Sequence, residues 1–156
     1  MIAVDIPGFK NLTLEHLVLD LNGTIVVDGH PHPDLAATLA ELSRTMHVGC
    51  ITADTRGLAV VLAAELDIEM QIIRPGDEIE QKAAYVRELG AEHVVAIGNG
   101  ANDAGMLEAA AVGIAIIGRE GAYAGLLGSA DVVVGRITDA LGLLSNTDRL
   151  RATLRR

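Results

Sequence analysis

Residues 16–24 read HLVLDLNGT, an apolar run of strand length that ends in a carboxylate, Asp20, and continues into the turn formers Asn22 and Gly23. Similar aliphatic runs recur along the chain, and amphipathic stretches of helix length separate them. Such alternation is typical of repeated strand–helix units, so it predicts a parallel sheet covered by helices.

The pattern places the expected elements as follows. Strands are predicted near residues 16–20, 47–51, 70–73, 93–97, 112–117 and 131–134. Helices are predicted near 34–46, 56–66, 78–89, 102–110, 120–128 and 136–144, with a short last helix from about Asp148. Two apolar stretches around a Pro7-Gly8 turn predict an N-terminal hairpin added to the edge of the sheet. We expect a three-layer α/β/α Rossmann-like fold, in one domain covering residues 1–156.

Composition supports this class and excludes others. Half of the residues are hydrophobic but only 2% are aromatic, so the core must be aliphatic, which suits parallel strands buried on both faces. A net charge of -9 argues against a nucleic-acid partner, which requires a basic surface. No apolar stretch reaches about 18 residues and no signal-peptide layout opens the chain, so we expect no membrane association and a cytoplasmic location.

Two isolated features receive ordinary interpretations. The single cysteine, Cys50, lies in an apolar run and is predicted to be a small buried hydrophobe. The basic C-terminal residues are predicted to be a solvated face of the last helix, favoured by the helix dipole. They are Arg149, Arg151, Arg155 and Arg156.

Polar residues follow three of the predicted strands. The first strand leads into DLNGT at 20–24, the second into TADT at 52–55 and the fourth into GNGAND at 98–103. Each segment alone is an ordinary turn or helix cap. Because the carboxyl ends of parallel strands meet at one edge of a sheet, the three should converge. Carboxylates, hydroxyls, amides and glycines in one small volume are what a metal and phosphate site requires.

Together these motifs resemble those of the haloacid dehalogenase-like superfamily. DLNGT looks like its Asp-x-x-Gly-Thr phosphorylation motif, and Lys82 falls where the superfamily keeps its lysine. TAD at 52–54 and GNGAND at 98–103 are similar to the Thr-Gly-Asp and Gly-Asp-Gly-x-Asn-Asp motifs of the P-type ATPase branch. The resemblance covers residues 15–145 and is closest to the soluble P-type ATPase-like phosphatases. It implies a Mg²⁺-dependent phosphohydrolase whose substrate is a phosphorylated small molecule or a phosphoprotein.

The resemblance also implies roles for individual residues around a metal. Asp20 would attack phosphorus and form an aspartyl-phosphate. Magnesium prefers hard oxygen ligands, which Asp20, the main-chain carbonyl of Asn22, and Asn99 or Asp103 would supply. Asp103 has a simpler alternative, a first-turn helix carboxylate favoured by the dipole, and the two roles are compatible.

The implied phosphate site draws on a second set of residues. The hydroxyl of Thr52, with Ala53 beside it, and the backbone N–H groups around Leu21 and Asn22 would hold phosphoryl oxygens. Lys82 would neutralise charge on Asp20 and on the phosphate. Taken alone, Lys82 would be interpreted as part of an exposed intrahelical ion pair.

Two departures from the family pattern affect the expected chemistry. Asn22 stands where typical phosphatases carry an aspartate as general acid and base, and an amide cannot shuttle a proton. Proton transfer usually contributes about 10²–10⁴-fold, so slow turnover is expected. Asp54 is the nearest substitute proton carrier, with helix capping as its alternative role. Asn99 replaces a charged metal ligand, which predicts weaker magnesium binding.

These departures keep a second hypothesis open, a regulatory or phosphate-binding protein that acts through a partner. A detached pump domain is the least favoured interpretation, because no nucleotide-binding insertion is present. Residues 25–51 leave no room for a cap domain, and an uncapped site is compatible with a homo-oligomer whose neighbouring subunit covers it. His30 and His32, in the loop at 27–33, are predicted to be surface residues although they lie near the first motif.

Overall fold

A computed structural model describes residues 1–54 and 57–156. Its centre is a six-stranded sheet in which all neighbouring strands are parallel, as predicted. In spatial order the strands are β10 (Val132–Val134), β9 (Val112–Ile116), β8 (Val94–Gly98), β3 (His16–Asp20), β6 (His47–Thr52) and β7 (Glu69–Ile72).

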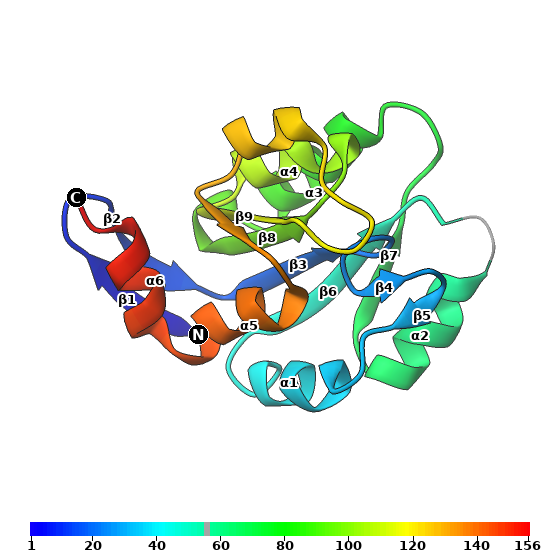
Figure 1. Cartoon of the computed structure of the whole chain (residues 1–156), viewed down its shortest axis with the longest axis horizontal. Coiled ribbons are helices and arrows are strands. Elements are labelled where there is room, and N and C mark those ends of the chain that lie inside the picture. Colours follow the sequence, from blue (N-terminus) through cyan, green and yellow to red (C-terminus); the bar gives the residue numbers. More distant parts are fainter. Residues whose placement is uncertain (55–56) are drawn as a thin grey trace.

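Helices cover both faces of this sheet, so the three-layer α/β/α prediction is confirmed (Figure 1). One face carries α1 (Leu35–Leu42), α2 (Leu58–Leu66) and α5 (Ile137–Ser145). The opposite face carries α3 (Glu78–Glu88) and α4 (Ala104–Ala109). No helix in the described ranges is long and apolar enough to cross a membrane.

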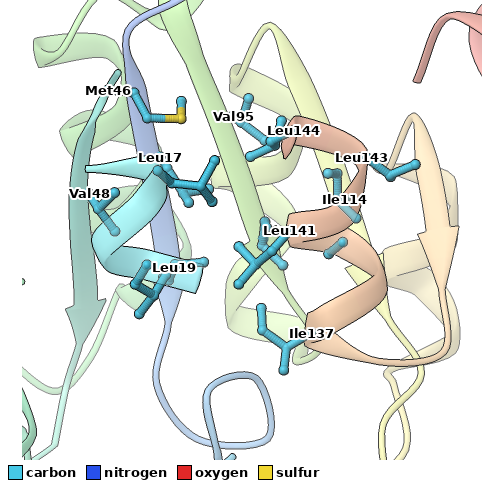
Figure 2. Close-up of a cluster of buried hydrophobic side chains, with 14 of the residues drawn as sticks. Leu17, Leu19, Met46, Val48, Val95, Ile114, Ile137, Leu141, Leu143 and Leu144 are labelled. Atoms are coloured by element: carbon cyan, nitrogen blue, oxygen red, sulfur yellow. The ribbon is translucent and has the colours of Figure 1, made fainter. Parts of the chain in front are cut away.

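The hydrophobic core consists of two clusters, because successive side chains of the central strands point to opposite faces of the sheet. Leu17 and Leu19 of β3 pack in the larger cluster with Leu141 of α5 (Figure 2). Val18 points to the other face, where it packs with Val86 of α3. Successive side chains of a strand point to opposite faces, so Asp20 follows Val18 toward α3. The end of β3 thereby aims its carboxylate at the helix that carries Lys82.

The N-terminal hairpin is present, but its predicted place at the edge of the main sheet was wrong. β1 (Ile2–Ile6) and β2 (Lys10–Leu14) form a separate two-stranded antiparallel sheet. Only Glu15 separates β2 from the central strand β3. The backbone of Glu15 forms hydrogen bonds with the backbones of His93 and His47 on its two sides. A hairpin so close to the centre cannot reach an edge. Instead α6 (Thr147–Leu154) packs against it, with Arg151 Nε donating to the Asp5 carbonyl at 2.9 Å.

Other boundaries differ locally from the predictions. The helix expected at 120–128 is only a short 3-10 turn, Ala124–Gly128 (η3), and the helix at 102–110 opens with another, Ala101–Asp103 (η2). The loop at 27–33 contains a small hairpin, β4 (Val26–Val27) with β5 (His30–Pro31). Asp28 and Gly29 supply the two positive φ angles, 53° and 81°, that its tight turn requires. The predicted helix start at 55–56 lies outside the described residues.

The predicted absence of a cap domain holds for the described chain. Between β3 and β6 the chain forms only the β4–β5 hairpin and α1. The described residues between β6 and β7 form α2. The carboxyl edge of the sheet is therefore left open on the side where the three motifs end.

Candidate active site

The three polar motifs converge on one cavity at the carboxyl edge of the sheet. Asp20 ends β3, Thr52 ends β6 and Gly98 ends β8, three adjacent strands. The cavity has a volume of about 650 Å³. It is lined by Asp20, Asn22, Asp28, Gly29, Thr52, Ala53, Asp54, Leu58, Glu78, Asn99, Gly100, Asn102 and Glu120.

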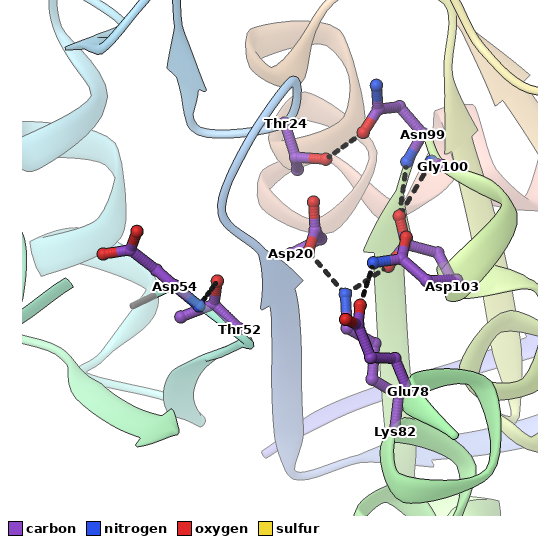
Figure 3. A network of polar contacts seen from close by, with 10 residues as sticks. Asp20, Thr24, Thr52, Asp54, Glu78, Lys82, Asn99, Gly100 and Asp103 are labelled. Carbon is purple, nitrogen blue, oxygen red and sulfur yellow. Dashed lines mark hydrogen bonds and ion pairs between the residues drawn. The ribbon is translucent and has the colours of Figure 1, made fainter. Parts of the chain in front are cut away.

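A buried lysine holds the carboxylate at the base of the cavity. Lys82 Nζ donates to Asp20 Oδ1 at 2.5 Å and to Asp103 Oδ1 at 2.7 Å (Figure 3). Lys82 is 0% exposed, which excludes the surface ion pair considered from the sequence. It is buried because Lys82, Ala83 and Val86 share the face of α3 that packs on the sheet. The second oxygen of Asp20 points away from Lys82.

Asp103 anchors Lys82 from behind and does not line the cavity. Its Oδ2 accepts hydrogen bonds from the backbone N–H groups of Asn99 and Gly100, both at 2.9 Å. Its side chain is fully buried. A Cβ at Gly98 would come within 2.5 Å of Asp103 Cγ, so glycine is required where the carboxylate crosses β8. Both oxygens of Asp103 thus have partners in the protein.

The second motif forms a self-bonded turn on the opposite wall. The Thr52 hydroxyl accepts a hydrogen bond from Asp54 N–H at 3.1 Å, and its residue is 2% exposed. Asp54 Oδ2 accepts from Ala59 N–H at 3.1 Å in the first turn of α2, which is the helix-capping role considered for it. Thr52, Ala53 and Asp54 all line the cavity that Asp20 faces.

Comparison of the sequence with known protein families identifies a family whose members are hydrolases. Residues 2–111 match the model of the haloacid dehalogenase-like hydrolases. The chain belongs to this family. An uncharacterized protein of Methanocaldococcus jannaschii is 45% identical over 84 residues, which are 51% of this chain and 90% of that protein.

A P-type pump is also among the relatives. The probable copper-transporting ATPase SynA of Synechococcus elongatus is 33% identical over 127 residues. The match covers 80% of this chain but only 14% of the ATPase. The chain therefore corresponds to a small part of that pump, as the P-type motifs at 52–54 and 98–103 suggested.

Solved structures share the fold of this haloacid dehalogenase-like chain. A 3-deoxy-D-manno-octulosonate 8-phosphate phosphatase of Moraxella catarrhalis, solved with magnesium, phosphate and the sugar, has a TM-score of 0.69. It is 17% identical, and the match covers 91% of this chain and 94% of that one. A phospho-aspartyl intermediate analogue of phosphoserine phosphatase has a TM-score of 0.67, with 15% identity and 85% and 99% coverage. At such identities the likeness establishes the fold.

Burial controls the protonation of the acidic group at the cavity base. Burial and, to a smaller extent, the charge of Asp103 raise the pKa of Asp20, whereas Lys82 lowers it, and together these effects raise the pKa of Asp20 to about 7. For Lys82, burial lowers the pKa, but the two carboxylates outweigh this and leave the pKa raised. Lys82 is therefore a fixed cation at neutral pH, whereas Asp20 in the metal-free protein exchanges its proton near neutrality.

The charged residues that line the cavity are all acidic within the described part of the chain. They are Asp20, Asp28, Asp54, Glu78 and Glu120. The oxygen-rich lining fits a hard divalent cation such as Mg²⁺. No group of three or more His, Cys, Asp or Glu side chains that could hold a metal occurs in the described ranges. A cation would therefore combine Asp20 with amide or backbone oxygens and water.

Sequence reasoning missed several of the lining residues. Glu78 had a detectable signal, because it stands four residues before Lys82 and so shares its helix face; its Oε2 accepts from Asn102 Nδ2 at 2.8 Å. Glu120 had none, since it belongs to the loop after β9. His30 and His32 do not line the cavity, in agreement with the surface role expected of them. Cys50 is buried as predicted, and burial raises its thiol pKa well above the usual value.

Proposed function

We propose that this protein is a magnesium-dependent phosphomonoesterase in which Asp20 is the nucleophile. The observation that carries the proposal is the buried Asp20–Lys82–Asp103 arrangement directly beneath an open, oxygen-lined cavity. Two ion pairs that are almost fully withdrawn from water add little to stability, because the cost of desolvation offsets most of their attraction. Their presence beneath a cavity therefore favours a functional role. Membership of a hydrolase family supports the same conclusion.

In the proposed reaction the two carboxylate oxygens of Asp20 have different tasks. Lys82 holds Oδ1, which fixes the carboxylate and leaves the second oxygen to attack phosphorus. The new bond joins Asp20 to the phosphoryl group while the bond to the leaving oxygen breaks, and water later hydrolyses the aspartyl-phosphate. Thr52, Ala53 and the backbone around Leu21 and Asn22 would hold the phosphoryl oxygens, and Lys82 would reduce the negative charge between Asp20 and the phosphate.

Magnesium would be held by Asp20, the Asn22 carbonyl and the oxygens near Asn99, with waters completing the shell. When bound, it would neutralise charge on the phosphoryl oxygens. Asp103 contributes to this site chiefly by fixing Lys82, since both of its oxygens are already hydrogen-bonded.

Proton transfer is the weak point of the proposed reaction. Asn22 lines the cavity, but its amide can only hydrogen-bond the leaving group and cannot donate a proton to it. Asp54 also lines the cavity and is the candidate substitute proton carrier, and its Oδ2 accepts a hydrogen bond from Ala59 N–H of α2. We therefore expect turnover to be slower than with a positioned general acid, which contributes ~10²–10⁴-fold to the rate.

Asn22 also favours a second candidate, a regulatory or phosphate-binding protein that retains the pocket without useful catalysis. A screen of phosphorylated metabolites and phosphopeptides with Mg²⁺ separates the two. A phosphatase releases phosphate from at least one of them, and Asp20→Asn abolishes the release. Binding of phosphate without any release, in both the parent and Asp20→Asn, would instead support the regulatory role.

A further inference from the structure

Asn99 occupies a junction between three segments that border the cavity. Its backbone N–H donates to Asp103 Oδ2, and its carbonyl accepts from Tyr123 N–H at 2.9 Å. Its side chain bonds in two further directions. Oδ1 accepts from the Thr24 hydroxyl at 3.4 Å, and Nδ2 donates to the Gly121 carbonyl at 3.2 Å. The side chain thus spans from the loop after Asp20 to the loop after β9.

The loop after Asp20 packs closely against this amide. A Cβ at Gly23, where φ is +79°, would come within 2.3 Å of Asn99 Nδ2. A Cβ at Gly118 would lie 3.4 Å from the Gly23 carbonyl, so the loop after β9 also meets the Asp20 loop directly. Gly23, at a positive φ, thus lets the backbone of the Asp20 loop come close to the amide.

The junction extends to the far wall of the cavity. Gly121 follows Glu120, whose Oε1 accepts from Asp28 N–H at 3.1 Å in the β4–β5 turn. Gly121 N–H in turn donates to the Gly118 carbonyl at 2.9 Å. Asp28 and Glu120 both line the cavity. The Asn99 amide therefore supports the loop that holds the β4–β5 turn over the space in front of Asp20.

The chemistry of this position requires an amide. The side chain must accept from Thr24 and donate to Gly121, and asparagine does both, whereas a carboxylate only accepts. An aspartate here would set its oxygen against the Gly121 carbonyl oxygen and leave that carbonyl without its donor. The asparagine in place of the expected charged metal ligand is thus explained by the neighbouring loop.

We propose that Asn99 is a positioning residue, whose amide ties the loop at 117–123 to the Asp20 loop and so sets the shape of the cavity wall in front of Asp20. The functional consequence rests on the proposed phosphatase activity, but the tie itself does not. Losing the tie should raise KM for a substrate with a bulky leaving group more than it lowers kcat, because the wall is displaced while Asp20 and Lys82 stay in place.

The test is amide hydrogen exchange at Gly121 and Tyr123 in the metal-free protein. Loss of one net hydrogen bond, about 0.5–1.5 kcal/mol, corresponds to roughly 2- to 13-fold faster exchange, which is the result expected for Asn99→Asp. Asn102→Asp is the matched control, since it adds the same charge to the cavity lining three residues away and its side-chain amide bonds to Glu78 of α3 instead of to the loop at 117–123. Its Gly121 and Tyr123 exchange rates should equal those of the parent.

Unchanged exchange in Asn99→Asp, together with tighter Mg²⁺ binding, would overturn the proposal and make Asn99 an ordinary metal ligand. If Asn99→Asp does not fold, the side-chain NH₂ signals of Asn99 in the parent protein decide the matter by NMR. Slow exchange of these protons supports the tie, and rapid, solvent-averaged exchange refutes it. These measurements need neither substrate nor turnover, so they are independent of the phosphatase assay with Asp20→Asn.

Discussion

Replacement of Lys82 by methionine removes the charge from the cavity base while keeping a long apolar side chain. Lys82 neutralises Asp20 and Asp103 at 2.5 and 2.7 Å, and the exposed fractions of the three side chains are 1%, 8% and 0%. Solvent therefore cannot screen the two carboxylates that the substitution leaves behind. Removing one partner of such a buried pair costs about 3–5 kcal/mol of the free energy of unfolding.

The loss should depend on pH in a definite direction. The raised pKa of Asp20 means that its ionisation costs stability as pH rises from the ordinary carboxylate range toward about 7. Without Lys82 only the backbone hydrogen bond of Leu21 opposes burial and the charge of Asp103, so the pKa of Asp20 rises further and the carboxyl stays protonated at pH 5. We therefore expect the full loss at pH 8 and a smaller one at pH 5.

Urea unfolding of the parent and Lys82→Met at both pH values measures this loss. Adding Asp20→Asn to Lys82→Met should recover about 1–3 kcal/mol at pH 8, because one unpaired buried charge disappears. A loss below about 1 kcal/mol at pH 8, or a larger loss at pH 5 than at pH 8, would refute the electrostatic account of this site.

Three further predictions concern the metal, the proton and the substrate. Mg²⁺ should raise the melting temperature by mass action, and more at pH 8 than at pH 6, because Asp20 must lose its proton to bind the ion. Asp20→Ala should abolish this shift. An equal shift in the variant would show that Mg²⁺ binds elsewhere. Asn22→Asp should raise phosphatase turnover on an aryl phosphate at least ~10-fold, and no gain with magnesium still bound would point to Asp54 or to a binding role. Glu120→Gln should lower KM for the same dianionic substrate by roughly 2-fold in low salt, since it removes one repulsive charge from the cavity wall, and a KM that is unchanged or raised would count against this reasoning.

Much of the fold was predictable because its signals are local. Strand-length aliphatic runs such as residues 94–97 define buried strands, and alternation along β3 decides that Asp20 shares the α3 face with Val18. The spacing of Lys82 and Val86 places both on the buried face of that helix. The Asp20–Lys82 contact, between residues far apart in the chain, follows from these two periodicities and the order of the strands.

Other features depend on tertiary placement and leave no local signal. The hairpin before Glu15 was assigned to a sheet edge, although its direct continuation into the central strand prevents this. The turn at Ala124–Gly128 resembled a helix in its apolar spacing, but Gly125 and Gly128 lower helix stability and only a short 3-10 turn forms. The contacts of Glu120 with Asp28 could not be read from sequence, because loops bring them together.

The role of Asp103 shows the same limit within the site. Its position in the GNGAND motif predicts proximity to Asp20, and Lys82 does bridge the two carboxylates. Whether it faces a metal or a protein donor depends on the turn at Asn99 and Gly100, whose N–H groups occupy its second oxygen. Backbone donors of this kind are invisible in a pattern of side chains.

Trapping of the phosphorylated protein tests the central claim most directly. Because Asn22 cannot activate water, the aspartyl-phosphate should accumulate when the protein is mixed with Mg²⁺ and an aryl phosphate and then quenched in acid. Mass spectrometry should locate one hydroxylamine-sensitive phosphoryl group on the peptide that contains Asp20, and Asp20→Asn should carry none. Phosphate release without this adduct, or an adduct on another residue that persists in Asp20→Asn, would contradict the assignment of Asp20 as the nucleophile.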